Sequence, residues 1–158
     1  STAMAMLHRA VTPTDDPLVV RRTALDLLAR REYAMRELAV RLSARFGSGA
    51  PVDAVVQQLH EEGLQSDQRF AESFVRGQRR RGRGPLRILH ELAERGVERE
   101  LAAACVDASA PEWVEVARQW KCRRHGEARP ATLAERQRIA RQLQQRGFDA
   151  SQIRRALD

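Results

Sequence analysis

Apolar residues recur along this chain at intervals of three and four positions, with charged residues between them. Leu38 and Leu42 are four apart, and Val52, Val55 and Leu59 follow the same spacing. This period places apolar side chains on one face of an α-helix. No segment alternates apolar and polar residues with the period of two that is typical of strands. The pattern therefore predicts nine helices in three groups of three.

Proline and glycine mark the expected helix boundaries. Pro51 and Pro85 suit first helical turns, and Gly63 and Gly96 suit helix ends. A stretch of charged and small residues, 123–130, is predicted to be a loop. In the first helix we expect Leu18, Val20, Leu25 and Leu28 to lie near one inward face.

One pattern occurs twice, 51 residues apart. The first copy is Arg87, Ile88, Leu92, Arg95, Gly96 and Val97, and the second is Arg138, Ile139, Leu143, Arg146, Gly147 and Phe148. A weaker third copy comprises Leu38, Leu42, Phe46, Gly47, Gly49 and Val52. A repeat of this length indicates one supersecondary unit copied along the chain. We predict an all-α fold of three tandem three-helix, helix-turn-helix-like repeats in an elongated array.

The repeats suggest the domain boundaries. We expect a flexible N-terminal lead-in over residues 1–17, a first repeat over 18–65, a second over 66–108 and a basic third over 109–158. A unit of about 45–50 residues buries little surface alone, so neighbouring repeats should stack on each other. We expect a monomer.

Positive charge is concentrated at the C-terminal end of the chain. The net charge is +7, and residues 118–158 hold ten Arg and Lys121 against four acids. Such an excess favours an acidic partner, nucleic acid first. There is no run of about 18 apolar residues and no apolar secretion signal, so we expect no membrane span and a cytoplasmic protein. Cys105 and Cys122 lack metal-ligand spacing and are expected to be buried thiols.

The sequence gives little support for an enzyme. With Lys121 as its one lysine, the chain has no phosphate-binding P-loop. The segment from His90 to Glu94 begins like a zinc-protease helix, but Glu94 stands where the second histidine ligand is needed. We predict no catalytic residues, no cofactor and no metal. An enzyme whose residues meet only in space stays open as a minor alternative.

Two groups of basic residues are candidate binding surfaces. The first comprises Arg76, Arg79, Arg80, Arg81, Arg83 and Arg87, and the second includes Lys121, Arg123, Arg124, Arg138, Arg141 and Arg146. Guanidinium groups this close repel one another unless an anion neutralises them, and a Gly-rich elbow flanked by arginine suits a phosphate backbone. The alternative is a solvated face paired with acids on other helices. Trp113 and Trp120 could stack on bases, although we favour a place in the core.

The order of short motifs along residues 18–158 resembles the RecX family, the bacterial regulators of the RecA recombinase. The first set is Ala24, Leu28, Arg31, Glu32, Glu37, Leu38 and Leu42. The second is Gly63, Leu64, Asp67, Phe70, Ala71 and Phe74. The third is Gly84, Ile88, Glu91, Leu92, Arg95, Gly96 and Val97. Ala34 departs from the family, which usually has a helix-capping serine there, so we expect a frayed helix start.

The resemblance implies a protein that binds the groove of RecA–DNA filaments and suppresses RecA ATP hydrolysis, strand exchange and coprotease activity. These activities belong to recombination, DNA repair and the SOS response, and many members of the family also bind DNA. Asp67, Phe70, Ala71 and Gly96 are carried over as family-motif positions. The alternative is a stand-alone helical protein that binds single- or double-stranded DNA.

Overall fold

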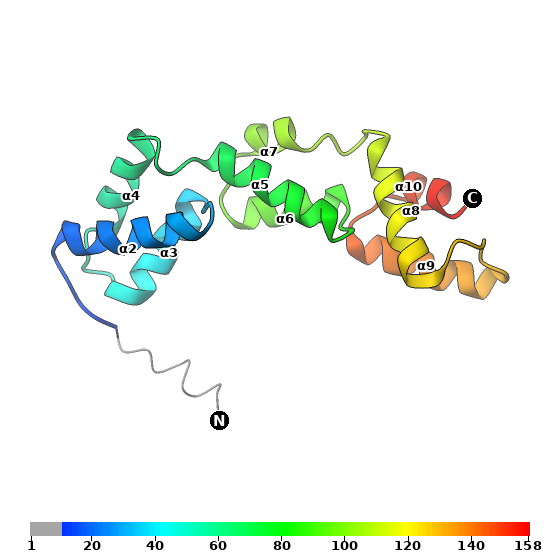
Figure 1. Cartoon of the computed structure of the whole chain (residues 1–158), viewed down its shortest axis with the longest axis horizontal. Helices are drawn as coiled ribbons and strands as arrows, with labels where there is room; N and C mark the ends of the chain where they lie inside the picture. Colours follow the sequence, from blue (N-terminus) through cyan, green and yellow to red (C-terminus); the bar gives the residue numbers. More distant parts are fainter. Residues whose placement is uncertain (1–10) are drawn as a thin grey trace, which may run out of the picture. The chain divides into compact units, whose positions relative to one another are not determined.

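The computed structural model describes residues 11–158, and within that range it contains nine helices and no strand (Figure 1). The helices are α2 (Pro17–Arg30), α3 (Met35–Phe46), α4 (Val52–Glu61), α5 (Asp67–Arg80), α6 (Pro85–Glu94), α7 (Arg99–Cys105), α8 (Glu112–His125), α9 (Leu133–Arg146) and α10 (Ala150–Leu157). The predicted all-helical fold is confirmed. Of the predicted lead-in over residues 1–17, residues 1–10 lie outside the described part of the chain.

The chain divides into two compact units, the first ending at Phe70 and the second beginning at Ala71, within α5. In the first unit, α2, α3 and α4 pack around one core. Its buried residues are Val20, Ala24, Tyr33, Leu38, Leu42, Phe46, Val52, Val55, Val56 and Leu59. This division into two units does not test the boundaries of the three repeats, which stay a prediction.

The predicted inner face of α2 was partly wrong. Val20 and Ala24, four positions apart, are fully buried, whereas Leu18 is 69% exposed. Two residues along an α-helix correspond to a rotation of about 200°. Leu18 therefore lies on the opposite side of the helix from Val20, while Leu25 and Leu28 flank the buried stripe and are half-buried.

The repeated apolar positions of the second unit all lie in its core. Ile88, Leu92 and Val97 of the first copy and Ile139, Leu143 and Phe148 of the second are each at most 4% exposed. α6 packs against α7, and α10 packs against both α8 and α9. The sequence repeat therefore marks the buried side of α6 and of α9.

The predicted loop over 123–130 was wrong at its start, because α8 continues to His125. Gly126 ends the helix with a φ of 86°, a conformation that glycine adopts without the steric cost of a Cβ. The three residues before it are helical since their amides continue the hydrogen-bonding of α8. Arg123 and Arg124 consequently project from the last helical turn and not from a loop.

Candidate interface for an acidic partner

The turn between α5 and α6 packs directly against the end of α9 within the second unit. The amide of Gly84 donates to the carbonyl of Arg146 at 2.7 Å, and the amide of Leu86 donates to the carbonyl of Gly147 at 3.0 Å. Gly82 adopts a φ of 73° and Gly147 a φ of 104°. We refer to residues 82–87 and 146–148 together as the joint. It brings the first basic cluster close to the C-terminal basic residues.

Arg146 secures this joint. Its Nε donates to the carbonyl of Gly82 at 2.9 Å, and its Nη2 donates to the carbonyl of Arg81. Its guanidinium also lies over the ring of Trp120, 4.8 Å from the centroid. Burial lowers the pKa of Arg146, and the charges of Arg83, Arg87, Arg123 and Arg124 lower it further. Arg146 thus has a structural role that its sequence position did not reveal.

The six arginines of the first cluster do not act alike. The Arg79 guanidinium lies 5.1 Å from the ring centroid of the buried Trp113. Arg83 donates to the side-chain oxygen of Gln78, and its own Nε is buried without a hydrogen-bond partner. Arg87 forms an ion pair with Glu91 at 3.0 Å. These three side chains therefore make contacts inside the second unit. The acid that Arg87 meets lies on its own helix and not, as the alternative expected, on another helix.

Arg76, Arg80 and Arg81 are exposed, and their side chains make no ion pair or hydrogen bond within residues 11–158. Arg76 and Arg80 line a surface groove between α5 and α8 together with Arg79, Glu112, Glu115, Val116 and Gln119. Two carboxylates in the lining reduce the positive potential of this groove. Arg81 is exposed and lies outside this lining.

Lys121 corrects the prediction for the second basic group. It is only 4% exposed, and its Nζ donates to the carbonyl of Ala128 at 2.6 Å. A lysine stem can be buried along apolar surface while its ammonium group bonds to a carbonyl. Lys121 therefore holds the loop after α8 and does not offer its charge to a partner.

The other candidates of the second group are exposed. Arg123 and Arg124 extend from the end of α8, and Arg138 and Arg141 lie on the outer side of α9. Trp113, the first of the two tryptophans, is 3% exposed, and its Nε1 donates to the carbonyl of Asp107. Trp120 is half-buried and contacts Arg146, so it lies at the edge of the joint.

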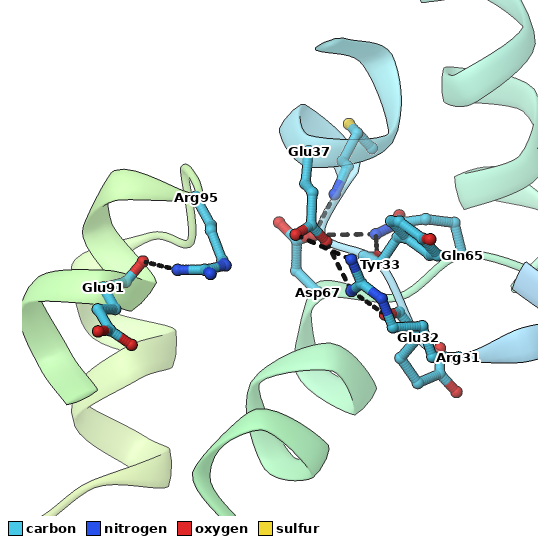
Figure 2. A network of polar contacts seen from close by, with 9 residues as sticks. Arg31, Glu32, Tyr33, Glu37, Gln65, Asp67, Glu91 and Arg95 are labelled. Carbon is cyan, nitrogen blue, oxygen red and sulfur yellow. Dashed lines mark hydrogen bonds and ion pairs between the residues drawn. The ribbon is translucent and has the colours of Figure 1, made fainter. Parts of the chain in front are cut away.

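The family-motif residue Asp67 replaces the missing cap of α3. Ala34 makes no capping hydrogen bond, but Asp67 Oδ1 accepts from the amide of Met35 at 2.8 Å. The same oxygen accepts from Nε2 of the buried Gln65 at 2.9 Å, and Gln65 also donates to the carbonyl of Tyr33 (Figure 2). We expected a frayed start of α3 because Ala34 stands in place of a capping serine. That expectation did not take into account the carboxylate of Asp67, which lies 32 residues further along the chain.

The remaining motif positions are structural as well. Phe70 and Ala71 are buried, and Gly96 has a φ of 80° at the end of α6. Arg95, the repeat equivalent of Arg146, donates to the carbonyl of Glu91 (Figure 2). Its guanidinium also lies over the ring of Phe74. An arginine at the end of the second helix that covers an aromatic ring is therefore common to both copies of the repeat.

Clusters of metal-ligating side chains and membrane-spanning helices are absent from the part of the chain that the structure describes. Within residues 11–158 no group of three or more His, Cys, Asp or Glu side chains could hold a metal ion. No helix in this range is both long and apolar enough to cross a bilayer. Cys105 and Cys122 are unpaired and half-buried, and burial raises the pKa of the Cys105 thiol, with a further contribution from the charge of Glu72. The thiol is therefore in its protonated, less reactive form at neutral pH.

Comparisons with known proteins agree on one family. Residues 66–106 match the family description "RecX, second three-helix domain", and residues 111–157 match "RecX, third three-helix domain". The chain is 44% identical to "Regulatory protein RecX" of Halorhodospira halophila over 87% of this chain and 85% of that protein. It is 43% identical to the protein of the same name from Stenotrophomonas maltophilia strain R551-3, over 84% of this chain and 82% of the relative.

The fold has a counterpart among solved structures. The crystal structure of RecX from Lactobacillus salivarius superposes with a TM-score of 0.70, covering 90% of this chain and 94% of that chain at 19% identity. At this identity the likeness concerns the fold alone. The three-helix repeats predicted from the sequence therefore occur in a protein whose sequence is largely different.

Proposed function

Since the chain belongs to the RecX family of regulatory proteins, we propose that it binds RecA–DNA filaments and lowers RecA activity. The activities concerned are ATP hydrolysis, strand exchange and the coprotease activity of the SOS response. The observation that carries the proposal is the similarity over most of the chain to proteins named regulatory protein RecX. We infer a non-enzymatic monomer that acts in the cytoplasm in recombination and DNA repair.

The charge distribution supports a partner with negative charge. A filament of recombinase on DNA presents phosphates along an extended groove, and exposed guanidinium groups bind phosphates through charge-assisted hydrogen bonds. Arg81, Arg123, Arg124, Arg138 and Arg141 are exposed in the second unit. An array of repeats suits such a groove because each repeat adds contacts of the same kind.

A second candidate function is binding to naked DNA without RecA. The observation in its favour is the charge excess of residues 118–158, which would attract any nucleic acid. The two candidates differ in whether the recombinase itself is recognised. Protein contacts with RecA would add affinity that naked DNA lacks.

Binding and turnover measurements test the proposal together. The protein is titrated onto RecA–single-stranded-DNA filaments and onto the same DNA alone at equal salt concentration. We expect tighter binding to the filament and a lower rate of ATP hydrolysis by the cognate RecA. Equal affinity for both, with unchanged ATP turnover at saturating protein, would favour the DNA-binding alternative and reject the regulatory function.

A further inference from the structure

A second groove of the second unit lies beside the joint and differs in chemistry from the groove between α5 and α8. Its volume is about 400 Å³. It is lined by Arg87 from α6, Trp120 and Arg124 from α8, and Gln142, Gln145 and Arg146 from α9. None of these lining residues is a carboxylate, whereas Glu112 and Glu115 line the groove that contains Arg76 and Arg80. The groove beside the joint is therefore a site of positive potential.

Five guanidinium groups gather around this groove. Arg83, Arg87, Arg123 and Arg124 lie close enough to Arg146 for their charges to lower its pKa, after the larger effect of burial. Among the five, the ion pair between Arg87 and Glu91 is the one that joins an arginine to a carboxylate within residues 11–158. Like charges held this close raise the free energy of the folded chain, and an anion in the groove would offset that repulsion.

The neutral side chains of the lining also supply hydrogen-bond donors. Oε1 of Gln142 lies 2.6 Å from Nε2 of His125, so its side-chain NH₂ group is left without a hydrogen bond inside the described chain. Gln145 is exposed. Trp120 forms one wall, with His125 at its edge and a centroid separation of 5.8 Å. Donors from three helices thus line a groove whose lining residues include no carboxylate, and of these donors Arg87 is paired with Glu91.

We propose that this groove binds a phosphate group and that the bound phosphate stabilises the joint between α5, α6 and α9. The phosphate belongs either to a nucleic-acid backbone or to a free anion, and both have the same oxygen acceptors. This proposal names a binding site for the proposed function. It rests on that function in one respect, the expectation that DNA supplies the phosphate. The coupling arises because Arg146 both lines the groove and bonds the carbonyls of Arg81 and Gly82.

The first experiment measures the melting temperature of the full chain against phosphate concentration, with chloride at the same ionic strength as reference. A ligand that binds only the folded state raises stability as its concentration passes its Kd. Phosphate also stabilises proteins by exclusion from their surface, so variants are needed to identify the site. We expect a saturating rise for the wild type and for Arg22→Gln, and most of that rise to be lost in Arg124→Gln.

Arg124 is suitable for this test because it is exposed and makes no ion pair or hydrogen bond within residues 11–158. Arg22→Gln is the matched control, since it removes the same charge from an exposed position on α2, outside both basic groups. An equal rise in all three proteins, or no rise in the wild type, overturns the proposal. Unchanged far-UV circular dichroism of both variants ensures that the comparison concerns folded protein.

A second arm identifies the source of the phosphate. A short single-stranded oligodeoxynucleotide is titrated in place of inorganic phosphate, at equal concentration of phosphate groups. A larger Arg124-dependent rise with the oligonucleotide assigns the groove to a nucleic-acid backbone, and an equal rise assigns it to a free anion. RecA is absent from both arms of the experiment. A negative result would therefore reject the phosphate site without rejecting regulation of RecA, and a failure to regulate RecA would leave the phosphate site untouched.

Discussion

Gly84 and Gly147 approach so closely that a Cβ atom on Gly84 would lie 2.4 Å from the carbonyl carbon of Gly147. A Cβ on Gly147 would likewise lie 2.5 Å from the Cβ of Arg87. Both contacts involve atoms that cannot move without a shift of the backbone. The two glycines are thus needed for the backbone hydrogen bonds that link the turn after α5 to the end of α9.

We therefore predict that Gly84→Ala destabilises the protein by about 1–3 kcal/mol, the usual effect of overpacking a close contact. The free energy of unfolding is measured by urea titration with circular dichroism. Gly77→Ala is the control, because Gly77 lies inside α5 with nothing within 4 Å of an added Cβ. It should stabilise the helix by up to about 1 kcal/mol. Equal stability of Gly84→Ala and wild type would contradict the close approach of the two turns.

The repeated leucines provide a test of the core. Leu92 and Leu143 are both fully buried and occupy the same position of the repeat. Replacement of either by alanine should lower the free energy of unfolding by roughly 2–5 kcal/mol, since it removes apolar contacts and leaves a cavity. The exposed Leu133→Ala is the control and should change stability little. Losses under about 1 kcal/mol at both core positions would show that the buried face of the repeat has been misplaced.

Asp67 tests the capping of α3 by a distant side chain. Asp67→Ala removes the acceptor of the Met35 amide and one of the two acceptors of the buried Gln65 side-chain amide. We expect a loss of about 1–3 kcal/mol, typical of unsatisfied buried polar groups. Asp67→Asn retains an acceptor oxygen and should lose less. Hydrogen exchange of the first turn of α3 reports the effect locally, and unchanged protection in Asp67→Ala would rule out the capping role.

The sequence predicted the helices and the buried positions of the second unit well, because each repeat buries one face of a helix with a period near 3.6. Ile88, Leu92, Ile139 and Leu143 follow from that pattern alone. The inner face predicted for α2 grouped Leu18 with Val20, although residues two positions apart on a helix point about 200° apart, and Leu18 is 69% exposed. A helical period therefore identifies a buried face only for residues that share its spacing.

Side-chain roles within the basic clusters could not be predicted from the sequence. The buried Lys121 and the half-buried Arg146 donate to carbonyls of residues 7 and 65 positions away, and no local pattern encodes such pairs. Arg79 covers Trp113 from another helix for the same reason. Charge density along a chain therefore identifies a region of interest, whereas contacts between helices decide which arginines remain exposed. That the repeats form an elongated array stays a prediction, which small-angle scattering would test.

Arg80 and Arg81 are the residues of the first cluster best suited to a binding test. Both are exposed, and Arg79 is left unchanged because its guanidinium covers the buried Trp113. We predict that Arg80→Glu with Arg81→Glu weakens binding to RecA–DNA filaments or DNA while the melting temperature stays nearly constant. Exposed charges contribute little to folding. Each lost phosphate contact should reduce the slope of log affinity against log salt by about 0.7–0.9.

A control variant with the same change in net charge separates a local contact from general attraction. Arg22 and Arg36 are exposed on α2 and α3, away from both basic groups in the sequence. If Arg22→Glu with Arg36→Glu weakens binding as much as the test variant, the effect reflects net charge alone. If the test variant keeps the affinity and salt slope of the wild type, Arg80 and Arg81 form a solvated face. The binding surface would then lie on the arginines of the third repeat, where Arg138→Glu with Arg141→Glu should show the loss instead.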